Sequence, residues 1–136
     1  MVNAKTVLVY DDEEDILELV QRALRTQYRV ITRNSLSHVL QDVQQIQPAV
    51  IVIDYQVNGL TSHDTVLQLK QDSQTAHIPI VLFTAYDNID ALARALKTDA
   101  FLGKPFSLKD LRGCIARFTD QPVPLQMPPA PVGETR

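Results

Sequence analysis

The stretch Ala49-Val50-Ile51-Val52-Ile53-Asp54 decides the fold, because an unbroken apolar run leads into a single carboxylate. A short apolar run rich in β-branched residues is typical of a strand buried on both faces, and such strands belong to parallel sheets covered by helices. Asp54 then lies where the strand ends, at the edge where open α/β sheets bind their ligands. Asp54 is therefore a candidate reactive group, whose significance depends on the residues that end the other strands.

Four more strands are predicted by short apolar runs, at residues 6–10, 28–32, 80–83 and 100–103. Between the strands, apolar residues recur with helical spacing. Helices are expected after the acidic residues 11–15, from a cap at Asn34 or Ser35 to Ile46, over residues 64–72, after a cap at Asp87 or Asn88, and from Ser107 to Phe118. The first helix should turn Ile16, Leu19, Val20, Ala23 and Leu24 inward. This alternation predicts a doubly wound parallel sheet with five strands and five helices on both faces.

Length and composition limit the possible functions of this 136-residue chain. We expect one domain over residues 1–120 and a Pro-rich tail or linker over residues 121–136. The net charge of −3 argues against nucleic-acid binding by this domain. No apolar run approaches the length of a membrane span, and no basic-then-apolar leader is present. The single cysteine, Cys114, excludes an internal disulfide, so we expect a cytoplasmic protein.

Reactive or charged groups end four of the five predicted strands, namely Asp11 and Asp12, Asp54, Thr84, and Lys104. Clustered carboxylates repel one another unless a cation joins them, and Mg²⁺ favours oxygen ligands that a substrate phosphate can complete. Asp54 could then attack phosphorus as a carboxylate nucleophile. Lys104 and the Thr84 hydroxyl could bind phosphoryl oxygens. The pattern predicts that Asp54 is a phosphate acceptor.

Four motifs carry these groups: Leu8-Val9-Tyr10-Asp11-Asp12-Glu13, Val52-Ile53-Asp54, Phe83-Thr84-Ala85 and Lys104-Pro105-Phe106. In this order and at this spacing they resemble the receiver domain of the two-component response-regulator family, over about residues 5–120. The set is specific, although an Asp-Asp or Lys-Pro pair alone would carry no weight. The resemblance implies a flavodoxin-like sheet with strand order 2-1-3-4-5.

By this resemblance, Asp54 accepts a phosphoryl group from a histidine kinase or a phosphotransfer protein. Asp12, Asp54 and the backbone carbonyl of Gln56 would bind Mg²⁺ or Mn²⁺, with Asp11 acting mainly through a metal-bound water. The domain would catalyse only its own phosphotransfer and dephosphorylation, as a switch in a phosphorelay and not as a turnover enzyme.

The resemblance also implies how the phosphorylated state is read. Thr84 and Phe101 would be the switch pair, and Lys104 would precede a cis bond at Pro105. Gln56 and Tyr86 occupy positions that resemble the family's tuners of phosphate lifetime. The surface of the fourth helix, fifth strand and fifth helix would contact a downstream protein target or an output domain absent from this chain, and could form a homodimer.

One departure from the family pattern concerns the loop after Asp54. Asn58 stands where the family usually has proline, immediately before Gly59. We expect this substitution to leave the loop freer but still prone to turn.

Three other functions are alternatives to the receiver hypothesis. A phosphatase or phosphotransferase with an aspartyl intermediate often carries a second Asp two positions after the nucleophile, but Gln56 stands there. A nucleotide or flavin binder needs a Gly-rich phosphate loop after the first strand, where this chain has acids. A degenerate receiver that acts as a phosphorylation-independent interaction module stays open as the alternative.

Overall fold

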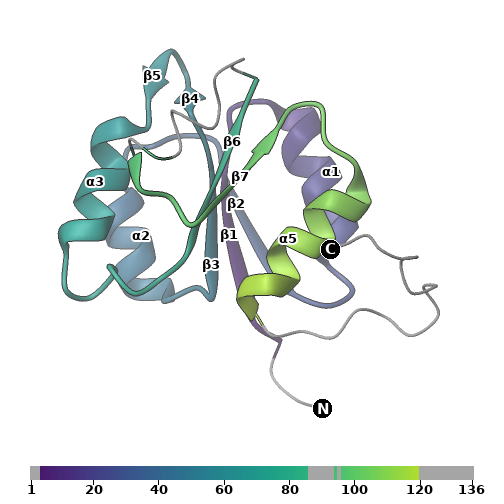
Figure 1. Cartoon of the computed structure of the whole chain (residues 1–136), viewed down its shortest axis with the longest axis horizontal. Helices are drawn as coiled ribbons and strands as arrows, with labels where there is room; N and C mark the ends of the chain where they lie inside the picture. Colours follow the sequence, from purple (N-terminus) through teal and green to yellow (C-terminus); the bar gives the residue numbers. More distant parts are fainter. Residues whose placement is uncertain (1–3, 86–93, 95, 120–136) are drawn as a thin grey trace.

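A five-stranded parallel sheet forms the centre of the computed structural model, which describes residues 4–85, 94 and 96–119. Its strands are β1 (Thr6–Tyr10), β2 (Arg29–Arg33), β3 (Val50–Asp54), β6 (Ile80–Thr84) and β7 (Ala100–Gly103). They lie in the order β2-β1-β3-β6-β7, with every neighbouring pair parallel (Figure 1). Counted along the chain within this sheet, the order is the predicted 2-1-3-4-5.

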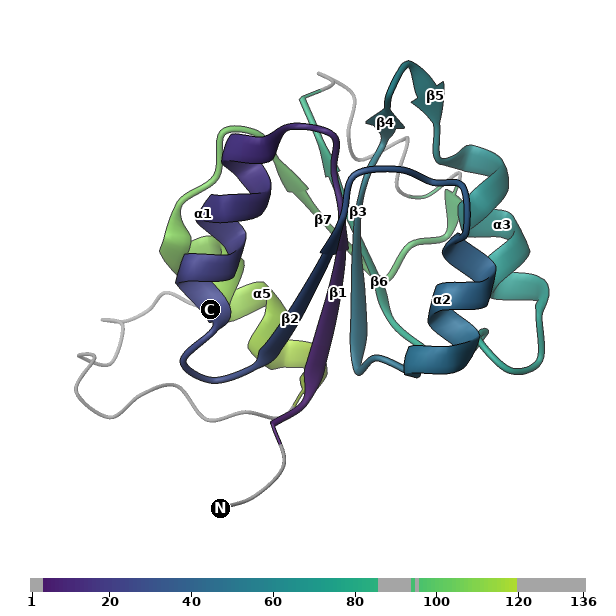
Figure 2. The ribbon, with the colours of Figure 1, turned by 180° about the vertical axis from the view of Figure 1, so that it is seen from behind.

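Helices cover both faces of the sheet, as Figure 2 shows. Residues of α1 (Glu14–Leu24) and α5 (Leu108–Thr119) pack on one face, and residues of α2 (Val39–Ile46) and α3 (His63–Gln71) pack on the other. The predicted fourth helix lies mostly outside the described residues. Leu96, which was expected on its inner face, is buried.

Alternation along the central strands explains why the chain builds two cores. Odd and even positions of a strand point to opposite faces, so a fully apolar strand supplies both. Toward α1 and α5 the strands send Val7, Val9, Val50, Val52, Val81 and Phe83. Toward α2 and α3 they send Leu8, Tyr10, Ile51, Ile53, Ile80 and Leu82. The edge strand β2 is less buried, in agreement with its mixed sequence.

Two local predictions were wrong. The second helix begins at Val39 and not after a cap at Asn34 or Ser35, because the Ser35 hydroxyl accepts a hydrogen bond from the Ser37 main-chain N–H and closes a separate turn. In α1 the inner face holds Leu17 in place of Leu19, whose side chain is exposed. The helix begins at Glu14, and Leu17 shares its buried face with Val20, Ala23 and Leu24 because these residues are three or four positions apart.

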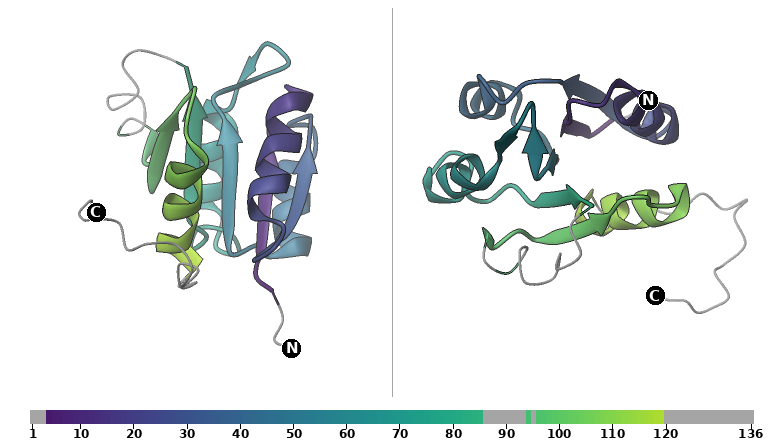
Figure 3. Two further views of the ribbon diagram at one scale, coloured as in Figure 1. Left: turned by 90° about the vertical axis from the view of Figure 1, so that its right-hand side faces the viewer. Right: turned by 90° about the horizontal axis from the view of Figure 1, so that it is seen from above.

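The loop after Asp54 contains the turn that Asn58 and Gly59 predicted. It forms a short antiparallel hairpin of β4 (Gln56–Val57) and β5 (Leu60–Thr61), turning at Asn58 and Gly59. Figure 3 shows this hairpin rising above the carboxyl edge of the sheet. None of the helices in the described part of the chain has the length and apolar character that a membrane span needs.

Candidate functional site

The carboxyl ends of the central strands bring the predicted site residues together. Asp54 is the last residue of β3, and Asp11 and Asp12 follow β1, its parallel neighbour. Lys104 follows β7, and the peptide bond between Lys104 and Pro105 is cis, as predicted. Parallel pairing is the physical reason for this meeting, since it aligns the ends of strands that are far apart in the sequence.

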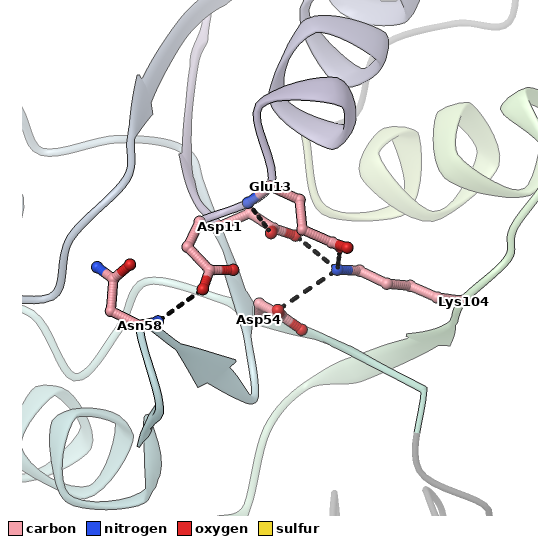
Figure 4. A network of polar contacts seen from close by, with 6 residues as sticks. Asp11, Glu13, Asp54, Asn58 and Lys104 are labelled. Atoms are coloured by element: carbon pink, nitrogen blue, oxygen red, sulfur yellow. Dashed lines mark hydrogen bonds and ion pairs between the residues drawn. The ribbon is translucent and has the colours of Figure 1, made fainter.

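The ammonium group of Lys104 contacts three acidic side chains (Figure 4). It donates to Asp11 Oδ2 at 2.8 Å, to Glu13 Oε1 at 2.8 Å and to Asp54 Oδ2 at 3.3 Å. The Glu13 main-chain N–H donates to the other oxygen of Asp11 at 2.9 Å. The positive charge of Lys104 therefore links Asp11, which follows β1, to Asp54, which ends β3.

The acids share too little positive charge. Asp11 is fully buried and Asp54 is 9% exposed. Burial, and next the negative charge of Asp11, raise the pKa of Asp54 to about 6, although Lys104 opposes this shift. Burial also raises the pKa of Asp11. Burial alone would lower the pKa of Lys104, but its hydrogen bonds to Asp11 and Glu13 and the negative charges of Asp54 and Asp11 together outweigh burial and raise it.

A divalent cation fits this donor set. One carboxylate oxygen from each of Asp11, Asp12 and Asp54 lies within 4.8 Å of the others, a spacing at which one ion can contact all three. The deficit of positive charge gives such an ion a favourable site. Asp12 is less buried than Asp11, and its Oδ2 accepts a hydrogen bond from the Asn58 main-chain N–H at 2.7 Å.

The other predicted residues are placed as follows. Thr84 ends β6, beside β3, and is 1% exposed. Phe101 lies on the edge strand β7 and is 40% exposed. Gln56 opens β4, two residues after Asp54. Tyr86 lies outside the described residues.

Two residues that contact the site were not predicted from the sequence. Glu13 was not among the predicted site residues, yet it binds Lys104. Asn58 was noted only as a turn residue, yet its main-chain N–H binds Asp12. The Asn-Gly pair predicted the turn. The contact between Asn58 and Asp12 could not be predicted, because it depends on where the hairpin lies in the folded domain.

Family comparison agrees with the fold and the acid cluster. The model of the response regulator receiver domain family matches residues 7–116, so the chain belongs to this family. It is a receiver domain of the two-component signalling type and not an enzyme of the usual kind.

Among its relatives is the alkaline phosphatase synthesis transcriptional regulatory protein PhoP of Bacillus subtilis, 34% identical over 79% of this chain. Another is the phosphate regulon transcriptional regulatory protein PhoB of Pseudomonas aeruginosa, 29% identical over 79% of this chain. The chain spans 45% of the length of the first and 48% of the second.

Solved structures show the same fold. The receiver domain of a response regulator from Bacteroides fragilis is 26% identical, with a TM-score of 0.76 over 88% of this chain and all of that one. The receiver domain of the sensor histidine kinase PA1611 from Pseudomonas aeruginosa has a TM-score of 0.78 at 16% identity, over 87% of this chain and 99% of that one, and was solved with magnesium in its active-site cleft.

Proposed function

We propose that this domain is a phosphorylation switch in which Asp54 accepts a phosphoryl group from a histidine kinase or a phosphotransfer protein. The observation that carries the proposal is the placement of Asp54 beside the carboxylates of Asp11 and Asp12 and the ammonium of Lys104, at the carboxyl edge of the sheet. The family match supports the same reading.

In the proposed step, an Asp54 carboxylate oxygen forms a bond to phosphorus while the P–N bond of the donor phosphohistidine breaks. The leaving histidine nitrogen takes up a proton. Asp54 is suited to this role because it is mostly ionised above pH 6 and is poorly solvated, which favours attack on phosphorus. Lys104 is within reach to exchange its contact with Asp54 for one with a phosphoryl oxygen.

Asp11, Asp12 and Asp54, with the backbone carbonyl of Gln56, are the proposed ligands of Mg²⁺ or Mn²⁺. When bound, such an ion neutralises the charge that gathers on the phosphoryl oxygens during transfer. The magnesium in the cleft of the PA1611 receiver structure supports this assignment.

The remaining roles are proposals of the same kind. Thr84 and Phe101 act as the switch pair, and Gln56 and Tyr86 tune the lifetime of the phosphate. The region around the fourth helix, β7 and α5 contacts a protein target, an output domain or a second copy. Residues 121–136 serve as a tail or linker, and the family favours a cytoplasmic location.

Intact mass spectrometry tests the acceptor. The native chain should gain one phosphoryl group when incubated with Mg²⁺ and acetyl phosphate. Asp54→Asn should gain none, because an amide is a poor nucleophile. Asp64→Asn, which removes a fully exposed carboxylate from α3, should gain mass like the native chain.

If neither the native chain nor Asp54→Asn gains mass with several donors, the acceptor role is wrong. The domain would then be a degenerate receiver that acts as a phosphorylation-independent interaction module. If both gain mass equally, the phosphoryl group is on another residue.

A further inference from the structure

The hairpin after Asp54 has a defined turn. Asn58 and Gly59 have φ angles of 55° and 80°. Positive φ at both central residues is what a two-residue hairpin turn of the Asn-Gly kind requires, and both residue types tolerate it. Proline holds φ near about −65°, so the residue usual in this family at position 58 does not fit this turn.

Asn58 makes two contacts that reach beyond the hairpin. Its main-chain N–H donates to Asp12 Oδ2 at 2.7 Å, as Figure 4 shows. Its side-chain Nδ2 donates to the main-chain oxygen of Asn34 at 2.8 Å. Asn34 directly follows the edge strand β2. The hairpin is therefore attached both to one of the clustered carboxylates and to the end of a strand two places away from β3.

We propose that Asn58 is a positioning residue of the metal site, an inference that rests on the proposed function. Its main-chain N–H holds Oδ2 of Asp12 and leaves Oδ1 as the oxygen for the cation. The Asn58 side chain keeps the hairpin in place through Asn34, so that the N–H stays aimed at Asp12.

A carboxylate held in this way suits a small divalent ion. Mg²⁺ binds through few protein oxygens and keeps several waters, so a ligand that offers one oxygen matches its needs. Hydrogen bonds to the unused atoms of a ligand orient it, and their removal typically weakens metal binding by about 10–100-fold. Asp12 needs this support more than Asp11, which is fully buried and is held by the Glu13 N–H and by Lys104.

The opposite effect of the same contact is also physically reasonable. If the amide competes with the ion for Asp12, loss of the N–H would strengthen Mg²⁺ binding. Loss of the N–H should therefore weaken Mg²⁺ binding if Asn58 positions Asp12, and should strengthen it if the amide competes with the ion. The two roles also predict different behaviour of the Asn58 amide proton when the ion binds.

The test is a titration of the full chain with Mg²⁺ alone, followed by isothermal calorimetry and by amide hydrogen exchange in NMR spectra. Asn58→Pro removes the N–H and should weaken Mg²⁺ binding about tenfold. Asn58→Gly keeps the N–H and tolerates positive φ but loses the side-chain contact with Asn34, so it should weaken Mg²⁺ binding by less than Asn58→Pro does. In the native chain the Asn58 amide should stay protected from exchange when Mg²⁺ is saturating.

Each outcome bears on the proposal. Unchanged or tighter Mg²⁺ binding in Asn58→Pro overturns it, as does an Asn58 amide that loses protection on saturation with Mg²⁺. The exchange measurement needs no variant, so it holds even if Asn58→Pro distorts the hairpin. A native chain that binds no Mg²⁺ overturns the metal site itself together with this role. Native Mg²⁺ binding without phosphorylation of Asp54 would contradict the acceptor role alone.

Discussion

At the scale of single residues, Asp54 shows the energetic cost of keeping a reactive carboxylate inside the protein. Its side chain is nearly buried, and Asp11 adds a second negative charge nearby. Lys104 offsets part of this cost but divides its charge among Asp54, Asp11 and Glu13. The ionised form of Asp54 is consequently disfavoured in the folded state without a metal.

Replacing Asp54 should therefore stabilise the metal-free protein at neutral pH. The folded-state pKa, about 6, lies above the ordinary value of 3.8, so Asp54 favours folding at low pH and loses this contribution as pH rises through 6. Since one pKa unit corresponds to about 1.4 kcal/mol, Asp54→Asn should raise the free energy of unfolding by up to about 3 kcal/mol at pH 7.5. Near pH 4 the gain should disappear.

Urea unfolding in EDTA at the two pH values measures this difference. Asp64→Asn is the matched control, because its carboxylate is exposed and should change little at either pH. A destabilised Asp54→Asn variant at pH 7.5 would contradict the prediction and would mean that the Lys104 contact outweighs burial.

At the scale of elements, α5 illustrates how local sequence and packing cooperate. Ser107 caps the helix, because its hydroxyl accepts a hydrogen bond from the Asp110 main-chain N–H at 2.9 Å. The buried residues Leu111 and Ile115 then face the core, and Cys114 lies beside them. Burial raises the pKa of the Cys114 thiol to about 11, so it serves as a packed side chain.

Loss of the cap should weaken the domain measurably. Ser107→Ala is expected to lower the free energy of unfolding by about 1 kcal/mol, because the Asp110 N–H loses its partner. Ser107→Asp should retain most of the stability, since Asp also caps helices. Thermal and urea unfolding compare these variants with Ser73→Ala, an exposed serine outside the helices. Equal stability of Ser107→Ala and the native chain would show that the cap contributes nothing.

At the scale of the whole molecule, the two ends of the described domain meet at the edge of the sheet where β1 and β2 begin. Lys5 Nζ donates to the main-chain oxygen of Thr119 at 2.8 Å. The buried Thr119 hydroxyl lies 3.0 Å from the Tyr28 hydroxyl. These contacts join the start of β1, the start of β2 and the end of α5, so they connect sequence-distant segments on the side opposite the acids.

Thr119→Val tests the value of this junction. The change keeps the shape of the side chain but removes the oxygen, leaving the buried Tyr28 hydroxyl without this partner. We expect a loss of about 1–2 kcal/mol in the free energy of unfolding, measured by urea denaturation. Thr61→Val, on the exposed strand β5, is the control and should change stability little. If both variants unfold alike, the junction is not a source of stability.

The sequence by itself determined the parallel sheet and the group of residues at its edge, whereas the strand order was implied by the resemblance to the receiver family. The apolar runs of β1, β3 and β6 can be satisfied only by burial on both faces, and this forces a parallel sheet with helices on each side. Once the strands are parallel, Asp11, Asp12, Asp54, Thr84 and Lys104 must end on the same edge. This part was predictable because it depends on periodicity and strand direction.

Only the tertiary structure decided which of these groups touch and which others join them. The Glu13–Lys104 contact and the Asn58–Asp12 contact depend on the placement of a helix start and of a hairpin, which no local pattern encodes. The later start of α2 has the same origin, because hydrogen bonds within residues 35–37 competed with the helix. Spacing along a chain predicts faces and edges, whereas contacts between separate segments follow from their packing in three dimensions.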